Sequence, residues 1–178
     1  MSGPRLGPGR PAGPGIPLTA EQRTALSGPV VVLPTAADTR AFGARLAAVL
    51  RPGDLIILTG PLGAGKTALV QGIGAGLGVQ GQVVSPTFVI ARVHPGAVPL
   101  VHVDAYRLAS VAEVDDLDLD VDTEAVVTAV EWGAGVAEQL ADTRLEIAIA
   151  RVPDSEERTA RLLPHGGDWA TRIAPLGA

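Results

Sequence analysis

Residues 60 to 67 read GPLGAGKT and fit the spacing G-x-x-x-x-G-K-[ST]. Such a loop can surround a phosphate, because glycine places no Cβ between the backbone and the anion. The helix expected after it adds free N–H groups and the positive end of its dipole. The pattern therefore predicts a phosphate-binding loop. The candidate nucleotide contacts are Gly60, Pro61, Leu62, Gly63, Ala64, Gly65, Lys66 and Thr67.

Lys66 is the only lysine of the chain, and the other thirteen of its 14 basic residues are arginines. A compact ammonium fits beside the β- and γ-phosphates, where the broad guanidinium fork of arginine would not. The alternative is a glycine-rich turn that matches the spacing by accident. The apolar run LIILT directly before the loop, which is typical of a buried strand, favours the phosphate-binding reading.

Two acids follow apolar runs and are candidates for catalysis. Asp104 ends PLVHVD and Glu131 ends AVVTAVE. Open α/β sheets bind ligands at the carboxyl ends of their strands, and hydrolysis needs magnesium and an oriented water. With the hydroxyl of Thr67, one acid would hold Mg²⁺ and the other would orient water. The alternative for each acid is a strand end capped in solvent.

Three further residues have weaker assignments. Thr87, in VVSPTFVI, lies where a γ-phosphate sensor would sit, although a plain Ser-Pro turn fits the same spacing. His102, two residues before Asp104, is expected to be structural. Arg107 could steady phosphate charge or meet a partner's acid, with a surface salt bridge as the alternative.

The segment EVDDLDLDVDTE, residues 113 to 124, carries seven acids in twelve residues. Its D-x-D-x-D spacing suggests a calcium loop. That reading fails, because Thr123 replaces the glycine of the turn and Ala129 stands where the bidentate glutamate should be. The segment is expected to be solvated, with a docking surface for a basic partner as the second choice.

Composition indicates a soluble chain. Of its 178 residues 47% are apolar without a membrane-length run, and the absence of cysteine fits the cytoplasm. A net charge of −5 argues against a broad nucleic-acid-binding face. Ten of the first seventeen residues are Gly or Pro, so residues 1–28 are predicted to be a disordered tail and residues 29–178 a single domain.

Alternating strands and helices predict an α/β fold of the P-loop type, with three layers and a mostly parallel mixed sheet. Thr35 and Asp38 have the spacing of a capping box at the start of a helix over residues 34–50. Another helical stretch is expected near Gly135 to Leu140. The expected strands are Val30 to Leu33, Leu55 to Thr59, Thr87 to Val93, Val98 to Asp104, Ala125 to Val130 and Leu145 to Ala150.

The stretches GPLGAGKT, SPTF, HVDAYRL and EWG, in this order and in so short a chain, resemble the TsaE family, formerly YjeE. The resemblance covers roughly Val30 to Arg161. It implies a cytoplasmic ATPase that uses ATP and Mg²⁺ and is needed to form threonylcarbamoyladenosine in tRNA. It also implies that the ATPase acts with the TsaB and TsaD proteins, TsaD being the one that transfers the threonylcarbamoyl group.

The resemblance also implies roles for individual residues. Thr67 and Glu131 would be magnesium ligands, Asp104 would have the Walker B-like role, and Thr87 would lie in a switch-like segment. Trp132 would lie beside the active site.

Two further nucleotide contacts are implied by weaker matches. Arg158, in SEERTARL, would be the arginine that reaches the nucleotide from a late hairpin, and Ala36 would touch it through its backbone. The chain departs from the common pattern at Pro61, where many members have an acid, and at Gly133, where proline is frequent.

Three other functions compete with this reading. A small GTPase needs an N-K-x-D or T-K-x-D motif, which a chain without asparagine and without a second lysine cannot supply. A small-molecule kinase would need an acceptor pocket and an arginine-rich lid, whereas the arginines are spread along the chain. A regulatory subunit whose nucleotide only sets a binding state is the non-enzymatic alternative.

Overall fold

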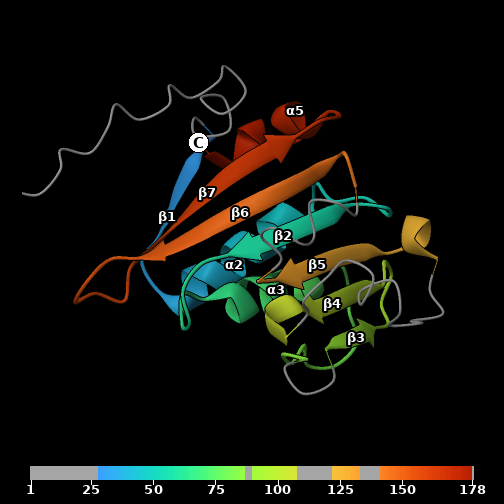
Figure 1. The fold of residues 1–178 in the computed structure, drawn as a ribbon, viewed down its shortest axis with the longest axis horizontal. Coiled ribbons are helices and arrows are strands. Elements are labelled where there is room, and N and C mark those ends of the chain that lie inside the picture. The colour runs from blue at the N-terminus through green and yellow to red at the C-terminus, as the bar shows by residue number, and fades with distance from the viewer. Residues whose placement is uncertain (1–27, 87–89, 108–121, 133–140, 178) are drawn as a thin grey trace, which may run out of the picture.

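Seven strands form one mixed sheet in the order β1-β7-β6-β2-β5-β4-β3 (Figure 1). The structure is a computed structural model that describes residues 28–86, 90–107, 122–132 and 141–177. No helix in these ranges is long and apolar enough to cross a membrane. The strands are β1 (Val30–Leu33), β2 (Leu55–Thr59), β3 (Ala91–His94), β4 (Leu100–Asp104), β5 (Val127–Glu131), β6 (Arg144–Arg151) and β7 (Arg158–His165).

The centre of the sheet is parallel and its flanks are antiparallel. β6, β2, β5 and β4 run in the same direction, whereas β1, β7 and β3 pair antiparallel with their neighbours. Four of the five residues of β2 and all five of β4 are buried, as expected for strands covered on both faces. The predicted α/β class and mixed sheet are therefore confirmed.

The three described α-helices pack against one face of the sheet. α2 (Ala36–Ala47), α3 (Lys66–Gly76) and α5 (Trp169–Ile173) contribute side chains to the larger hydrophobic core, together with alternate residues of β2 and β6. A smaller apolar cluster lies on the other face and includes Ile57 and Val103. A second helical layer is absent from the described ranges, and the helix expected near Gly135 to Leu140 lies outside them.

Glycines let α2 and α3 approach each other closely. A Cβ on Gly43 would lie 2.4 Å from the carbonyl oxygen of Leu69, and one on Gly72 would lie 2.0 Å from that of Arg40. Any side chain at either position would push the helices apart. This contact fixes α3, and with it the loop before α3, against the rest of the core.

The start of α2 agrees with the sequence. The Thr35 hydroxyl accepts a hydrogen bond from the Asp38 amide at 3.2 Å, and the Thr35 amide donates to the Asp38 carboxylate at 3.0 Å. This is the predicted capping box, which satisfies otherwise unpaired N–H groups of the first turn.

Some predicted elements differ from the structure. The strand expected at Thr87 to Val93 is displaced, because β3 occupies Ala91–His94 and residues 87–89 lie outside the described ranges. β7 and α5 were not predicted by pattern. The tail predicted at residues 1–28 and the acidic segment at 113–124 fall almost entirely outside the described ranges.

Candidate functional site

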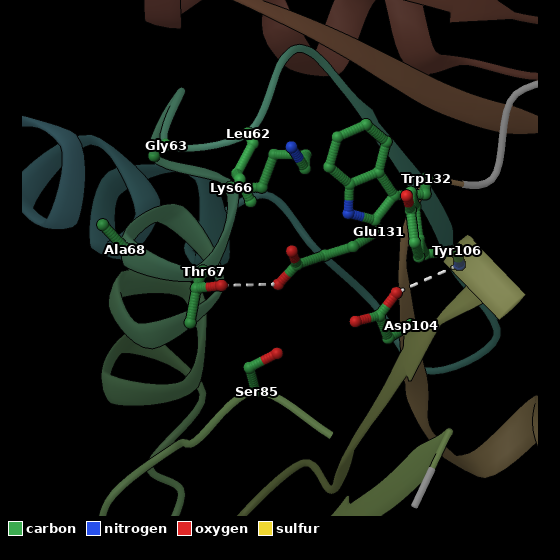
Figure 2. A pocket seen from close by; sticks show the side chains of 11 residues that line it. Leu62, Gly63, Lys66, Thr67, Ala68, Ser85, Asp104, Tyr106, Glu131 and Trp132 are labelled. Atoms are coloured by element: carbon green, nitrogen blue, oxygen red, sulfur yellow. Dashed lines mark hydrogen bonds between the residues drawn. The ribbon is translucent and has the colours of Figure 1, made fainter. Parts of the chain in front are cut away.

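A cavity of about 610 Å³ opens where β2, β4 and β5 end and α3 begins (Figure 2). This is the edge at which parallel α/β sheets bind ligands. The sheet therefore gathers residues that are far apart in sequence. The cavity is lined by Leu62, Gly63, Gly65, Lys66, Thr67, Ala68, Ser85, Asp104, Tyr106, Glu131 and Trp132.

The loop between β2 and α3 needs its glycines. Gly60, Gly63 and Gly65 have φ of 144°, 74° and 106°, in the region that L side chains rarely adopt. A Cβ on Gly60 would also lie 2.3 Å from the carbonyl oxygen of Ile149 on β6. The backbone can therefore turn sharply out of the sheet and lead into α3, whose first residue is Lys66.

The Lys66 side chain folds back over the loop. Its Nζ donates hydrogen bonds to the carbonyl oxygens of Gly60 and Pro61, at 2.8 and 3.0 Å. The same ammonium lies 3.7 Å from the centroid of the Trp132 ring. Burial lowers the pKa of Lys66, and the charges of Glu131 and Asp104 oppose that shift. The ammonium is thus held at the cavity with two carboxylates near it.

Asp104 and Glu131 are adjacent residues of neighbouring strands. They are paired in the parallel register of β4 and β5 and are 7% and 4% exposed, respectively. The Thr67 hydroxyl donates to Oε1 of Glu131 at 3.0 Å, and the Tyr106 amide donates to Oδ1 of Asp104 at 3.0 Å (Figure 2). The structure brings Thr67 and both acids to one wall of the cavity, while their separate roles stay predictions.

His102 belongs to this site, although the sequence suggested only a structural role. It is fully buried, and its Nε2 lies 2.8 Å from Oε1 of Glu131. Its position two residues before Asp104 on a strand is the signal that could have identified it, because alternate strand residues share a face.

The tryptophan after Glu131 has strained backbone geometry. Trp132 has φ of 61°, which is uncommon for a bulky residue and is often found at functional sites. Its amide donates to the carbonyl oxygen of Leu58 at 3.0 Å, and its ring makes an edge contact with Tyr106 at a centroid distance of 5.3 Å. The turn thereby holds the indole against Lys66.

Some predicted nucleotide contacts are not among the residues that line the cavity, namely Ala36, Gly60, Pro61, Ala64 and Arg158. Arg158 donates from Nε to the carbonyl oxygen of Ala64 at 3.1 Å, so it braces the loop from β7. Ala36 begins α2, and neither Ala36 nor Arg158 lines the cavity. Thr87 lies outside the described residues.

The donor set suits a phosphate and a hard cation. A hydroxyl and two carboxylates, as on Thr67, Asp104 and Glu131, are the oxygen ligands that Mg²⁺ prefers. The glycine loop, with positive φ at Gly60, Gly63 and Gly65, leads into the N-terminus of α3, and Lys66 supplies a positive charge beside the cavity. A Mg²⁺–nucleotide complex therefore fits the residues present.

A loop of sequence GPLGAGKT between a parallel strand and a helix, with acids at the ends of adjacent strands, defines a P-loop α/β protein. Comparison with known families narrows this class. The family described as "Threonylcarbamoyl adenosine biosynthesis protein TsaE" matches residues 33–160. The chain belongs to the TsaE family, as the four sequence stretches implied.

Several relatives share most of their length with the chain. The protein named tRNA threonylcarbamoyladenosine biosynthesis protein TsaE from Streptomyces coelicolor is 54% identical over 139 residues, which are 74% of this chain and 94% of that protein. Its namesake in Mycobacterium bovis is 44% identical over 157 residues, or 82% and 94% of the two chains. The crystal structure of Bacillus subtilis YdiB aligns with a TM-score of 0.68 and 32% identity, covering 83% of this chain and 92% of that one.

Proposed function

We propose that this chain binds ATP with Mg²⁺ at the P-loop and hydrolyses it in the formation of threonylcarbamoyladenosine in tRNA. One observation carries the proposal. The P-loop hydroxyl of Thr67 meets the strand-end carboxylate of Glu131 at 3.0 Å, beside Asp104 and below Lys66. The names of the relatives supply the biological process.

The P-loop and the two strand-end acids have separate tasks in this proposal. The peptide groups from Gly60 to Thr67 bind the phosphates, and the Lys66 ammonium moves from the carbonyl oxygens of Gly60 and Pro61 onto the β- and γ-phosphates. Thr67 and Glu131 hold the metal ion, which when bound neutralises phosphate charge. Asp104 orients the attacking water.

Base recognition is weak and favours adenine in this proposal, because the chain lacks the N-K-x-D or T-K-x-D motif that would read guanine strongly. Because the resemblance implies an ATPase that acts in a complex, we expect the isolated chain to hydrolyse ATP slowly. Following the family resemblance, it acts in the cytoplasm with the TsaB and TsaD proteins, and its hydrolysis sustains turnover of that complex.

The proposal is tested by reconstituting tRNA modification with purified TsaB and TsaD and the other reaction components, with and without this chain. Threonylcarbamoyladenosine should accumulate over many turnovers only when the chain and ATP are both present. Undiminished accumulation without the chain would reject the proposed process.

Nucleotide binding is tested separately by the fluorescence of Trp132, which adjoins Glu131 and covers Lys66. A Trp169→Phe variant removes the other tryptophan of the chain. Titration with ATP and Mg²⁺ should change the emission. Tight binding that is selective for GTP would contradict the proposed adenine nucleotide.

A further inference from the structure

We infer that His102 is a positioning residue that holds the Glu131 carboxylate in the orientation needed for metal binding. The inference rests on the proposed function and deepens it, because it concerns the same site. It begins with strand geometry. Leu100, His102 and Asp104 alternate along β4 and face the helix side, where Leu100 joins the core beneath α3.

Register explains how the imidazole reaches its partner. His102 is paired with Ala129 across the β4–β5 ladder, and Asp104 is paired with Glu131. Because Ala129 carries only a methyl group, the space beside it is open to the ring. Diagonal neighbours on a sheet are within reach of long or aromatic side chains. The His102 ring accordingly extends toward Glu131, one pair further along.

The contact itself is short and buried. Nε2 of His102 lies 2.8 Å from Oε1 of Glu131, and the two side chains are 0% and 5% exposed. A carboxylate only accepts hydrogen bonds, so Nε2 carries the proton and donates it. The other ring nitrogen, Nδ1, has no hydrogen-bond partner within the described part of the chain. Nε2–H is therefore the functional end of this imidazole.

Two donors converge on one oxygen of Glu131. Thr67 Oγ1 and His102 Nε2 both bond to Oε1, while the other carboxylate oxygen points away from Thr67 (Figure 2). If Thr67 turns its hydroxyl to a metal ion, as the proposed function requires, His102 still holds Oε1. The Glu131 carboxylate then keeps its orientation, and it still accepts one hydrogen bond that offsets the cost of burying its charge, when the metal ion replaces Thr67 as its partner.

The next strand carries a second buried histidine near His102 that is not hydrogen-bonded to it. His94 on β3 lies with its ring centroid 6.3 Å from that of His102 and is also buried. Burial lowers the pKa of His94, and His102 and Arg92 add to the shift. His94 makes no contact with Glu131 in the described residues, so it provides a matched control for His102.

The test compares His102→Leu, His102→Gln and His94→Leu. Mutation of a residue that orients a metal ligand typically lowers metal affinity or activity by about 10–100-fold. His102→Leu should weaken Mg²⁺-dependent ATP binding by about that factor, with binding of ATP in EDTA unchanged. His102→Gln retains a side-chain N–H donor and should recover most of the loss, and His94→Leu should bind as the wild type does.

A second measurement needs no nucleotide. In ¹⁵N-histidine-labelled protein, the His102 Nε2–H should give a slowly exchanging proton signal that is lost in Glu131→Ala and kept in Thr67→Ala. If His102→Leu loses ATP affinity equally with Mg²⁺ and with EDTA, His102 is only a structural residue and the inference is overturned. A His102 proton signal that is unaffected by Glu131→Ala would overturn it as well. If the wild type binds no nucleotide, the proposed function fails, and the proton signal still decides whether His102 holds Glu131.

Discussion

The ammonium of Lys66 has no substitute in the chain, since the other basic side chains are arginines. We expect Lys66→Ala to lower ATP turnover by at least about 100-fold, the scale of losing one positioned charge donor. Lys66→Arg should also fail, because the planar guanidinium does not fit the space between the loop carbonyls and Trp132. Hydrolysis measured with the partner proteins checks both, and a rate near that of the wild type in either variant would refute the corresponding expectation.

The two strand-end acids should separate binding from chemistry. Glu131→Ala removes a proposed metal ligand and should weaken binding of Mg²⁺–ATP at least about tenfold. Even the loss of a residue that only hydrogen-bonds to a metal ligand typically lowers metal affinity or activity by about 10–100-fold. Asp104→Asn should keep binding and lower turnover by about 100-fold, the effect of losing one acid–base group. Binding by calorimetry and single-turnover hydrolysis distinguish the two variants.

The opposite pattern would reverse the assignment of these acids. If Asp104→Asn loses binding and Glu131→Ala keeps it, Asp104 is the metal ligand. Normal turnover by both variants in the presence of partners would mean that neither strand end takes part in hydrolysis.

At the level of single residues, the sequence was informative where chemistry depends on local spacing. The P-loop is a contiguous motif, and Asp104 and Glu131 each follow their own apolar run, so their meeting at one sheet edge could be expected. The spacing of His102 from Asp104 places both on one face of a strand. Its contact with Glu131 could not be expected, because that contact depends on the register of β4 against β5 and on the small side chain of Ala129. Neither is written in the spacing of residues along one strand.

At the level of elements, the turn from β2 into α3 depends on Gly60. We expect Gly60→Ala to lower the free energy of unfolding by more than about 2 kcal/mol, since backbone strain of about 1–3 kcal/mol adds to the clash with the Ile149 carbonyl. Gly81→Ala is the matched control. Its φ of 84° is also positive, but nothing lies within 4 Å of the added Cβ, so its cost should be about 1 kcal/mol.

Urea unfolding of both glycine variants gives the comparison. Equal destabilisation would show that φ alone, and not the close approach of β6, requires glycine at position 60. The ATP affinity of Gly60→Ala should fall as well, since the loop positions the phosphate-binding peptide groups.

Elements were predictable where local signals agreed. β1, α2 and β2 have clear apolar runs or a capping box, and they lie where the sequence places them. β7 contains Pro164, which argues against a strand. Pro164 is tolerated because β1 pairs only with residues 158–161 of β7, so the strand is an edge beyond that point. α5 has five residues and no side-chain cap, too little for a helical pattern.

At the level of the whole molecule, the strand order could not be derived from local patterns. β2 lies between β5 and β6, which come about 70 to 90 residues later in the chain, and β1 pairs with β7. Such pairings are decided by how the apolar faces of distant segments bury one another. The sequence indicated a mixed sheet through its alternation of elements, while the order of the strands depends on contacts made only in the folded chain.

The segment after the family match, which ends at residue 160, is fastened to the core by Arg172. Its guanidinium donates to the carbonyl oxygen of Val49 and to the Asp54 carboxylate, and it lies 4.1 Å from the centroid of the Trp169 ring. Burial alone would lower the pKa of Arg172, but the bond to Asp54 and the nearby acids raise it above its ordinary value. The arginine thus ties α5 to the end of α2 and the start of β2.

Removing this tie should destabilise the whole domain. Arg172→Ala leaves the Asp54 carboxylate, which is 12% exposed, without its charged partner. We expect a loss of about 2 to 4 kcal/mol, slightly below the cost of breaking a fully buried pair. Arg51→Ala is the control, because the ion pair of Arg51 with Asp168 is solvent-exposed and should leave the urea midpoint unchanged within error. If Arg172→Ala unfolds at the same midpoint as the wild type, the contacts of Arg172 do not stabilise the domain, and α5 is held in place by its buried side chains Trp169 and Ile173.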